Sequence, residues 1–493
     1  MQEALNYING KWVRPISGKF TDVINPSNRE IIARASSSDE ADVEIAVEAA
    51  NASFYETRQW RDMAPADRAA VLFKIADKIE ERLGEIALCS TLNQGKPLRE
   101  AELDVSDTAS VFRYYAGLIT KPEGGIIPVN AGFGKAHVYE QREPVGVCAL
   151  ISPWNFPLLM AAWKVAPALA AGNSIILKPA SVTPLSCVKL FEIIDECGVP
   201  AGAANLILGP GGTIGEALSS HKKIDMVSFT GSTAVGRRIM INAAGNFKKI
   251  GLELGGKSPI IIFDDCDLER AIEWTMLGIF FNQGEMCCAT SRAIVHESVY
   301  DKFLQRLAER ANAIKIGLPQ NNPDMGAIVS ESQYKKVLGY IEKGKAEGAR
   351  LICGGEAYTE GECAKGYFIR PTVFADCTQD MTIVKEEIFG PVLCVSKFSS
   401  EEEAIAIAND SEYGLAGAVF TDNAFRAKRV LNELRAGICW HNCSQPAYCE
   451  APWGGYKMSG IGRDLGVHGL EEYQEIKQIV QSLEEGPLGW YEN

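Results

Sequence analysis

The sequence has no hydrophobic run long enough to cross a membrane. About 20 consecutive apolar residues are needed, and the most apolar window, residues 158–176, is interrupted by Lys164, Pro167 and Gly172-Asn173-Ser174. The first residues, MQEALNYINGKWVRP, also lack the basic start and continuous apolar segment of a secretory signal. We therefore expect a cytoplasmic protein with no membrane partner. The apolar window is expected to be a buried helix that leads into a strand.

Patterns that hold metal ions are also missing. The five histidines show no clustering, there is no C-x-x-C pair, and Cys439 and Cys443 have the wrong spacing for a zinc ribbon. The 14 cysteines are scattered between Cys89 and Cys449, as expected of reduced, mostly buried thiols in a cytosolic protein. We expect no metal site.

Positive charge is in deficit, with 49 Lys and Arg against 63 Asp and Glu and a net charge of −14. A nucleic acid or an anionic membrane would be repelled by such a surface, so neither is an expected partner. The composition is otherwise that of a soluble protein, with 46% hydrophobic residues. A chain of 493 residues is too long for one hydrophobic core, and two to four domains are expected.

The pattern of apolar residues predicts an α/β fold. Residues 7–13 and 20–24 alternate around a turn and predict one hairpin, followed by helices at 39–54, 65–86 and 98–119. Short apolar strands without polar alternation then alternate with helices, which indicates a parallel sheet covered on both faces. The predicted strands are 146–151, 174–177, 206–208, 224–229 and 250–254, and the predicted helices are 158–170, 184–197, 213–219 and 234–243.

A second α/β region follows from residue 258 to about 454, with strands near 259–263, 292–295 and 415–420. Two segments have strand-like alternation without a helical period, roughly 124–140 and 475–482. They suggest an arm outside the main cores, of the kind that often mediates oligomerisation. The expected architecture is two interleaved α/β domains with a small strand appendage.

Three segments contain residues suited to catalysis. Cys287 follows a glycine-bearing turn in FNQGEMCCATSR and precedes a strand, where a thiol can face a cleft. Glu253 in LELGGKSP lies between two leucines at a strand end, and burial there would raise its pKa and make it a usable general base. Asn155 in PWNFP lies between a strand and a helix, where an α/β sheet opens toward ligands and an amide can stabilise an oxyanion. Each alone also fits a packing cysteine, an ion-paired glutamate or a capping asparagine.

Two glycine-bearing turns could admit a phosphate. Residues 209–215 (GPGGTIG) and 229–236 (FTGSTAVG) each follow a predicted strand and open a helix, and a helix N-terminus with small residues accommodates a pyrophosphate. Neither is a G-x-G-x-x-G or a P-loop. Alone they indicate only that a nucleotide is possible.

Together these segments resemble the aldehyde dehydrogenase superfamily, from NGKW at residues 9–12 to GGYKMSG at 454–460. LELGGK and N-x-G-x-x-C in this order are specific together, and residues 440–446 (WHNCSQP) and 451–455 (APWGG) look closest to betaine-aldehyde and ω-aminoaldehyde dehydrogenases. The resemblance implies a Rossmann-like dinucleotide-binding domain (1–123 and 143–253), an α/β catalytic domain (254–458) and a small β oligomerisation arm (124–142 and 470–493). It also implies a homodimer or homotetramer.

The same resemblance assigns roles. Cys287, rather than Cys288, would attack the aldehyde, Glu253 would activate water to hydrolyse the thioester, and Asn155 with the Cys287 N–H would hold the oxyanion. NAD or NADP would be the cofactor, held by Trp154, Lys178, Ser181, Gly211, Gly231, Ser232, Leu254, Glu387 and Phe389.

Three positions depart from the family pattern. Glu285 replaces a glutamine two residues before the nucleophile, and its charge would oppose thiolate formation unless it meets a partner. Ser181 replaces a glutamate that binds the adenosine ribose in NAD-preferring members, so NADP is expected to be accepted. Asp464 replaces a glutamate of a possible proton relay.

The substrate is expected to be a small aldehyde that enters near Phe156, Trp163, Ile438, Tyr448 and Trp453. Aromatic faces attract an ammonium group, although they also serve apolar aldehydes. The resemblance to plant-type relatives implies that isoleucine at 438, where those have a small residue, disfavours betaine aldehyde. The expected order is ω-aminoaldehyde, betaine aldehyde, then a general aliphatic aldehyde or semialdehyde. A CoA-acylating enzyme, a cysteine hydrolase with His296 and a non-catalytic nucleotide-binding protein are the alternatives, and retention of Cys287 and Glu253 disfavours the last.

Overall fold

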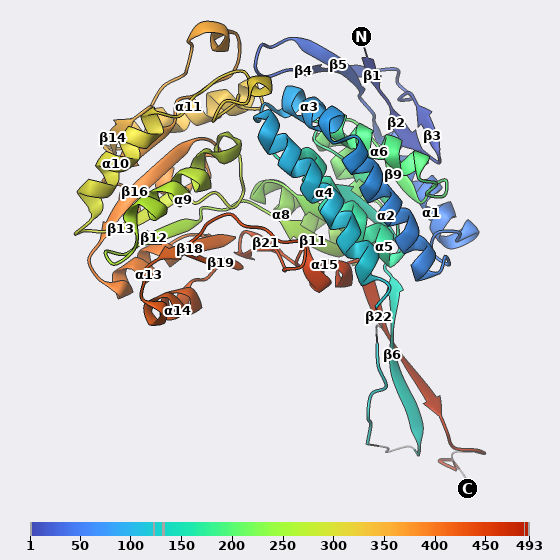
Figure 1. Ribbon diagram of the computed structural model, residues 1–493. Coiled ribbons are helices and arrows are strands. Elements are labelled where there is room, and N and C mark those ends of the chain that lie inside the picture. The colour runs from blue at the N-terminus through green and yellow to red at the C-terminus, as the bar shows by residue number, and fades with distance from the viewer. Residues whose placement is uncertain (1, 122–123, 131–133, 488, 492–493) are drawn as a thin grey trace.

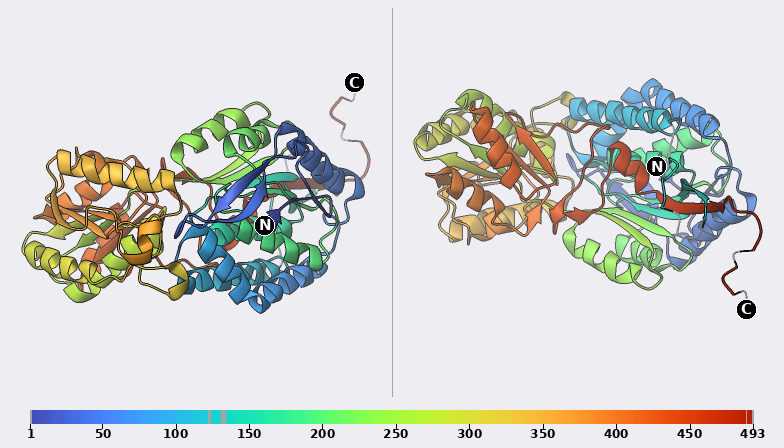
Figure 2. Two further views of the ribbon diagram at one scale, coloured as in Figure 1. Left: turned by 90° about the horizontal axis from the view of Figure 1, so that it is seen from above. Right: turned by 90° about the horizontal axis from the view of Figure 1, so that it is seen from below.

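The computed structural model describes residues 2–121, 124–130, 134–487 and 489–491. The chain forms two α/β lobes side by side and a two-stranded arm that projects from one of them (Figures 1 and 2). The predicted α/β fold class is confirmed. Among the described residues, no helix is long and apolar enough to cross a membrane.

The first lobe is built on an eight-stranded sheet with the order β21-β11-β10-β7-β8-β9-β2-β3. Its central strands are parallel and strongly apolar, and β7 and β8 are buried along their whole length, because helices cover both faces. The strands are β2 (Asn6–Ile8), β3 (Lys11–Val13), β7 (Val147–Ile151), β8 (Ser174–Lys178), β9 (Ala204–Leu206), β10 (Met226–Thr230), β11 (Lys249–Glu253) and β21 (Gly460–Ile461).

Helix α5 (Pro157–Ala171) is the centre of this lobe. All 15 of its residues are buried, as its nearly continuous apolar sequence requires, and this confirms the buried helix predicted for the most apolar window. The other helices of the lobe are α1 (Glu40–Asn51), η1 (Ala52–Thr57), α2 (Pro65–Glu81), α3 (Leu83–Gln94), α4 (Leu98–Leu118), α6 (Leu185–Glu196), η2 (Gly211–Gly215), α7 (Glu216–Ser220), α8 (Thr233–Ala243) and α15 (Gly466–Glu471).

The prediction that residues 7–13 and 20–24 pair with each other in one hairpin is wrong. Strands β2 and β3 already form a hairpin around Asn9 and Gly10, both at positive φ (51° and 73°), and Asn-Gly favours such a tight turn. The second predicted strand, β4 (Phe20–Ile24), instead pairs with β5 (Ile31–Ser36), to which β1 (Gln2–Ala4) adds in parallel.

The predicted helix 65–86 is also two helices. The backbone of Arg82 (φ −105°, ψ 15°) ends α2 and starts α3. The Arg82 guanidinium pairs with Glu196 at the end of α6, and a glycine at 84 weakens helix continuation locally. The chain changes direction between α2 and α3 at this break. The last residue of α3, Gln94, contacts the loop that carries Cys287, which is described below.

The second lobe holds a seven-stranded sheet with the order β14-β15-β16-β13-β12-β18-β19, in which only β14 is antiparallel. The strands are β12 (Pro259–Ile262), β13 (Arg292–His296), β14 (Arg350–Cys353), β15 (Thr372–Ala375), β16 (Val392–Phe398), β18 (Ala416–Phe420) and β19 (Ile438–His441). The helices are α9 (Leu268–Phe280), η3 (Phe281–Gly284), α10 (Tyr300–Asn312), η4 (Pro319–Asn321), α11 (Glu331–Ala346), η5 (Gly361–Lys365), α12 (Thr382–Lys385), α13 (Glu401–Asn409) and α14 (Ala424–Glu433).

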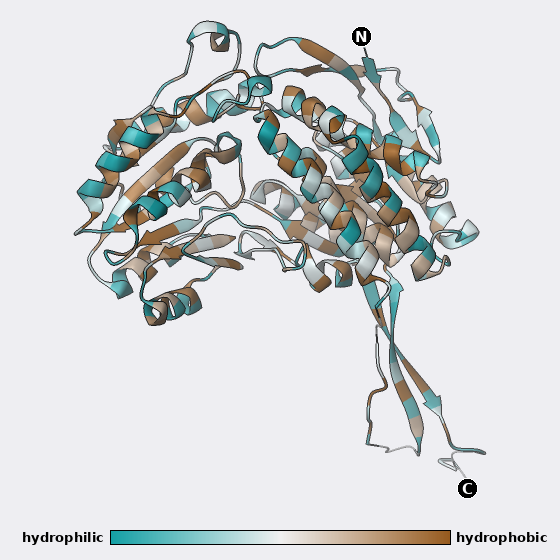
Figure 3. Ribbon diagram, viewed as in Figure 1, coloured by the Kyte–Doolittle hydropathy of each residue, from teal (hydrophilic) through white to brown (hydrophobic). Residues whose placement is uncertain are grey.

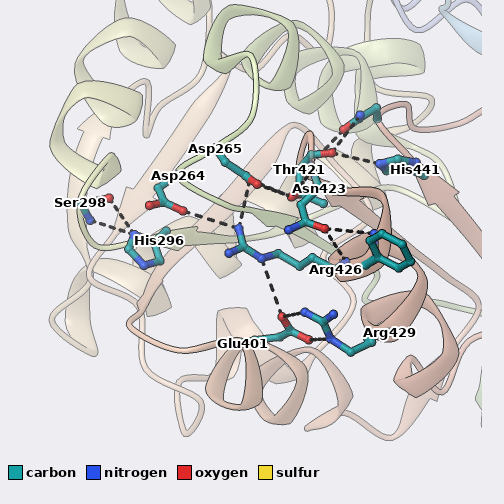
Figure 4. A network of polar contacts seen from close by, with 12 residues as sticks. Asp264, Asp265, His296, Ser298, Glu401, Thr421, Asn423, Arg426, Arg429 and His441 are labelled. Carbon is teal, nitrogen blue, oxygen red and sulfur yellow. Dashed lines mark hydrogen bonds and ion pairs between the residues drawn. The ribbon is translucent and has the colours of Figure 1, made fainter.

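A polar network fastens the last helices to this sheet. Arg426 of α14 lies over the Phe263 ring at 4.6 Å and is 3.2 Å from Asp265 and 3.7 Å from Glu401 (Figure 4). These ion pairs close the carboxyl end of β12. His296 lies in the same region, where its Nδ1 is 2.8 Å from Ser298 Oγ.

After the second lobe the chain returns to the first. A short pair, β17 (Tyr413–Gly414) with β20 (Tyr456–Lys457), precedes this crossing. Strand β21 then adds antiparallel to β11, with Glu253 opposite Gly460. Residues 460–471 therefore belong to the first lobe, whereas the predicted domain ranges left 459–469 unassigned and gave 470–471 to the arm.

The arm consists of β6 (Ala136–Pro144) and β22 (Gln474–Ser482), which are antiparallel over nine residue pairs. It extends from the first lobe, and the C-terminus lies at its tip (Figure 1). Brown, hydrophobic stretches remain uncovered along it (Figure 3), including Ile476 and Val480, each 59% exposed. The predicted arm ranges 124–142 and 470–493 overlap these two strands, and residues 131–133, 488 and 492–493 of those ranges lie outside the described part.

Candidate active site

Cys287 is presented by a loop with an unusual backbone. Asn282, Gln283 and Gly284 all have positive φ (48°, 55° and 74°), a conformation that costs a non-glycine residue about 1–2 kcal/mol. The loop is held from both lobes. The Asn282 N–H donates to Glu100 Oε2 (2.9 Å), and the Gly326 N–H donates to Gln283 Oε1 (3.3 Å).

Asn155 is tied to the same loop. It lies between β7 and α5, and its Nδ2 donates to the Glu285 carbonyl oxygen at 2.9 Å, while Asn282 Nδ2 donates to the Asn155 carbonyl at 3.0 Å. The turn after Glu253 also packs here, because a Cβ at Gly256 would clash with the Cys287 carbonyl oxygen. The three predicted catalytic segments therefore meet at one place.

Burial of Glu285, against the effect of its hydrogen-bond donors, removes the expected conflict with Cys287. Its side chain is buried, with the Val329 N–H donating to Oε1 (3.1 Å) and Gln94 Nε2 donating to Oε2 (3.0 Å). Burial raises the pKa of this carboxyl well above its usual value, so the protonated, neutral form is favoured. A neutral carboxyl does not oppose a thiolate two residues away.

The nucleophile candidate has a thiol neighbour. A hydrogen bond with the Cys288 thiol and burial both raise the pKa of Cys287. Cys288 in turn donates to Gln445 Oε1 at 2.9 Å, and Gln445 Nε2 donates to Ser444 Oγ at 2.8 Å. Gln445 has φ +79°, so a strained residue anchors the neighbour of the nucleophile. Both effects favour the neutral thiol of Cys287 over its thiolate.

Glu253 ends β11 in a buried position. Among the described residues, its Oε1 has no hydrogen-bond partner, which leaves the atom free for a water or a proton. Burial, and secondarily the nearby Asp464 carboxylate, raise the pKa of Glu253. Lys164 Nζ lies 3.1 Å from Asp464 Oδ2 and counteracts this effect. Such a carboxyl is suited to exchange protons near neutral pH.

One cavity brings together six of the predicted cofactor residues with Cys287 and Asn155. Trp154 and Phe389 pack edge to face at 5.0 Å, Glu387 Oε1 accepts from the Gly256 N–H at 2.9 Å, and Ser232 caps α8. Burial raises the pKa of Glu387. The six residues are Trp154, Gly231, Ser232, Leu254, Glu387 and Phe389.

The other three predicted cofactor residues lie outside this cavity. Lys178 ends β8, a Cβ on Gly211 would lie 3.6 Å from Lys178 Nζ, and Ser181 Oγ donates to the Gly209 carbonyl at 2.7 Å. Lys178 is 4% exposed, and no hydrogen-bond partner of its Nζ occurs among the described residues. Desolvation lowers its pKa to about 8. An ammonium at a strand end, beside a glycine that leaves space, fits the hydroxyl groups of a nucleotide ribose.

A second cavity of about 360 Å³ reaches Cys287 and Cys288 from another side. Its volume is within the range of small-molecule sites, about 300–1,000 Å³. Phe156, Trp163 and Trp453 line it as predicted, and the two tryptophans pack edge to face at 5.5 Å. Ile438 and Tyr448 do not line it: Ile438 packs against the core, and Tyr448 is 64% exposed.

The sequence analysis missed the acidic residues of this cavity. Asp104 and Asp107 of α4 both line it, and their i, i+3 spacing on one helix could have shown that they share a face. Asp104 forms a buried ion pair with Lys96, whose Nζ lies 3.8 Å from the centre of the Phe156 ring. The Lys96 ammonium therefore occupies one face of the Phe156 ring. Asp107 has no ion pair within the described part of the chain.

The cysteine-hydrolase alternative loses its structural basis. His296 lines neither cavity that contains Cys287, and instead packs against Phe398 at 5.2 Å, so a cysteine–histidine pair is not formed. Groups of three or more potential metal ligands are not found among the residues that the structure describes.

The comparisons agree with this geometry. Residues 12–479 match the model of the Aldehyde dehydrogenase family. The chain is 44% identical to a betaine aldehyde dehydrogenase of Bacillus subtilis over 98% of this chain and 99% of that protein. It is 46% identical to a peroxisomal aminoaldehyde dehydrogenase 2 of Malus domestica over 99% and 97%.

A crystal structure of betaine aldehyde dehydrogenase from Staphylococcus aureus in complex with NAD+ superimposes with a TM-score of 0.97. Its sequence is 43% identical, and the match covers 99% of this chain and 96% of that one. The expected enzyme class, an aldehyde dehydrogenase that uses a nicotinamide dinucleotide, is confirmed, and the chain belongs to the aldehyde dehydrogenase family.

Proposed function

We propose that this enzyme oxidises ω-aminoaldehydes to the corresponding amino acids. The observation that carries the proposal is the chemistry of the 360 Å³ cavity, which reaches Cys287 past tryptophan rings and Asp107. Aromatic faces and an unpaired carboxylate both attract an ammonium group, and neither favours a carboxylate-bearing semialdehyde. The names of the relatives, which include aminoaldehyde and betaine aldehyde dehydrogenases, support the same substrate class.

Cys287 is the proposed nucleophile and Asn155 the proposed oxyanion donor. One Nδ2 hydrogen of Asn155 is used by the Glu285 carbonyl, which fixes the amide and leaves the second hydrogen for the substrate oxygen. Such preorganised donors are typically worth ~3 kcal/mol each in the transition state. The cofactor, when bound, accepts the hydride that leaves the tetrahedral adduct.

Glu253 is the proposed base for hydrolysis of the thioester. Its uncommitted Oε1 can hold a water, and its raised pKa brings the carboxyl toward the working pH. Asp464 and Lys164 form an ion pair near Glu253. This pair would take up the proton of Glu253 and return it. This arrangement favours transfer of the acyl group to water rather than to CoA.

Both NAD and NADP are proposed as cofactors. Lys178 provides a cation beside the predicted ribose site. Ser181 has no carboxylate, and its hydroxyl group donates to the Gly209 carbonyl. A 2′-phosphate would meet no repulsion from these residues. A kcat/KM for NAD that exceeds the value for NADP by more than about a hundredfold would contradict this proposal.

We also propose a homodimer or homotetramer assembled through the β6–β22 arm, whose exposed Ile476 and Val480 would be covered by a second copy. The cytoplasm is the proposed location, because all 14 cysteines are free, as in reducing compartments.

The test of the substrate proposal is a panel of 4-aminobutanal, 3-aminopropanal, betaine aldehyde, succinate semialdehyde and acetaldehyde with both cofactors, with and without CoA. We expect the highest kcat/KM with the two amino aldehydes and no dependence on CoA. Asp107→Asn should lower kcat/KM for 4-aminobutanal but not for pentanal, which has the same chain length and is uncharged. A higher kcat/KM with acetaldehyde or the semialdehyde would overturn the substrate proposal.

A further inference from the structure

A second apolar depression lies beside the aldehyde cavity. It is formed by the exposed face of α4, by α9 and by the segment after α10. Leu103 and Leu277 are 56% and 40% exposed there, although large apolar side chains usually avoid contiguous exposure. We call it the α4–α9 groove, and its apolar lining includes Leu103, Trp274, Met276, Leu277, Phe280 and Ile314.

The groove adjoins the aldehyde cavity directly. Leu103, Trp274, Leu277 and Phe281 line both. Because Leu103 and Leu277 are exposed, they form a shared rim rather than a closed wall. A substrate that is longer than the aldehyde cavity would therefore emerge over these residues into the groove.

Both arginines at the edge of the groove are already paired, whereas Glu102, which also lines it, has no ion pair among the described residues. Arg310 lies 2.7 Å from Glu273, and Arg99 lies 3.4 Å from Asp324. A charged tail would have to compete with these pairs, whereas an alkyl group would gain from the apolar lining alone. The groove therefore favours an uncharged, apolar occupant.

We infer that the α4–α9 groove binds the alkyl substituent of N-alkylated ω-aminoaldehydes. The inference rests on the proposed function, since the aldehyde cavity has to hold the amino aldehyde itself. A secondary ammonium keeps its positive charge and still pairs with Asp107, which lines the aldehyde cavity. The substituent on nitrogen then continues past Leu103 and Leu277 into the groove.

The test compares 4-aminobutanal with its N-methyl, N-butyl and N-hexyl derivatives. A fully buried methylene is worth about fourfold in binding, and a half-open groove should give roughly tenfold in kcat/KM from N-methyl to N-butyl. An unchanged or falling kcat/KM along this series would overturn the inference.

Two variants change the groove without touching the aldehyde cavity. Met276→Glu and Ile314→Asp place a charge on residues that line only the groove. We expect at least a fivefold loss of kcat/KM with N-butyl-4-aminobutanal and less than a twofold change with 4-aminobutanal. Ile45→Asp on α1, a 49% exposed isoleucine outside both cavities, is the matched control and should change neither. Equal losses with both substrates would mean damage to the fold or the reaction, and would contradict the inference.

A parallel series of unbranched alkanals, from butanal to decanal, distinguishes failure of the groove inference from failure of the proposed substrate class. If 4-aminobutanal is no better than pentanal, the proposed substrate class fails. A kcat/KM that then rises along the alkanals, with the rise abolished by Ile314→Asp, would show that the groove binds an alkyl chain but would overturn its assignment to the substituent of an amino aldehyde. If chain length has no effect in either series, the groove inference fails while the proposed function is untouched.

Discussion

The carboxyl of Glu285 offers a sharp test of how the cysteine loop is held. In Glu285→Ala, the Val329 N–H and Gln94 Nε2 lose the acceptor that both now use. Each buried donor left unpaired costs about 1–3 kcal/mol, so the loss of stability should be about 2–6 kcal/mol. The backbone carbonyl of residue 285, which holds Asn155, is retained, but it would shift with the loosened loop, and a displacement of about 1 Å can cost ~10²-fold in kcat.

Glu285→Gln should behave very differently. Its side-chain oxygen can still accept from Val329, but its amide nitrogen would face Gln94 Nε2. Gln94 is not free to turn over, because its Oε1 accepts from the Lys96 N–H at 2.8 Å. The expected cost is one hydrogen bond, about 1–2 kcal/mol. Turnover should stay within about threefold of the wild type, because a neutral amide replaces a neutral carboxyl.

The assay is cofactor reduction with 4-aminobutanal from pH 6 to 9, together with the thermal midpoint of each variant. We expect superimposable pH profiles for the wild type and Glu285→Gln, and a lower midpoint for Glu285→Ala. If Glu285→Gln instead loses more than about tenfold in kcat or shifts the pH profile, the carboxyl is ionised and acts electrostatically on Cys287. The reasoning from its burial would then be refuted.

Three further predictions follow from the same contacts. Glu253→Gln should retain a burst of reduced cofactor while steady turnover falls ~10²–10⁴-fold, and loss of the burst in stopped-flow would contradict a role in hydrolysis alone. The pKa of Glu100 is raised to about 8 by burial, from 4.5, so its contribution to stability is complete below about pH 4.5 and is lost as the pH rises through 8. In Glu100→Gln, the thermal midpoint should therefore depend less on pH between 5 and 8 than in the wild type. An unchanged dependence on pH would disprove this. Peroxide should inactivate the wild type reversibly by joining Cys287 and Cys288, with release of two waters per peroxide, so the mass of the inactivated enzyme should fall by two hydrogens. A gain of oxygen instead, as expected for Cys288→Ser, would exclude that bond.

Local motifs were sufficient to identify the chemistry. Cys287, Glu253 and Asn155 each follow a strand or a turn that the sequence marks by apolar runs and glycines, and the carboxyl ends of parallel strands meet at one edge. The buried strands of both sheets were likewise predictable, because a sheet covered on both faces requires continuous apolar runs. Family membership followed from the same segments.

Features that depend on contacts between distant segments were not predictable. The charge state of Glu285 depends on Gln94 and Val329, which lie 191 and 44 residues away in the chain. The Phe156 ring is partly used by Lys96, and Tyr448 is exposed although its place in the motif suggested the substrate cavity.

The sequence by itself determined which residues can do chemistry, because that property belongs to side-chain type and local turn. Only the tertiary structure decided which of them are desolvated, paired or open to a ligand, because burial and hydrogen bonding arise from segments that meet on folding.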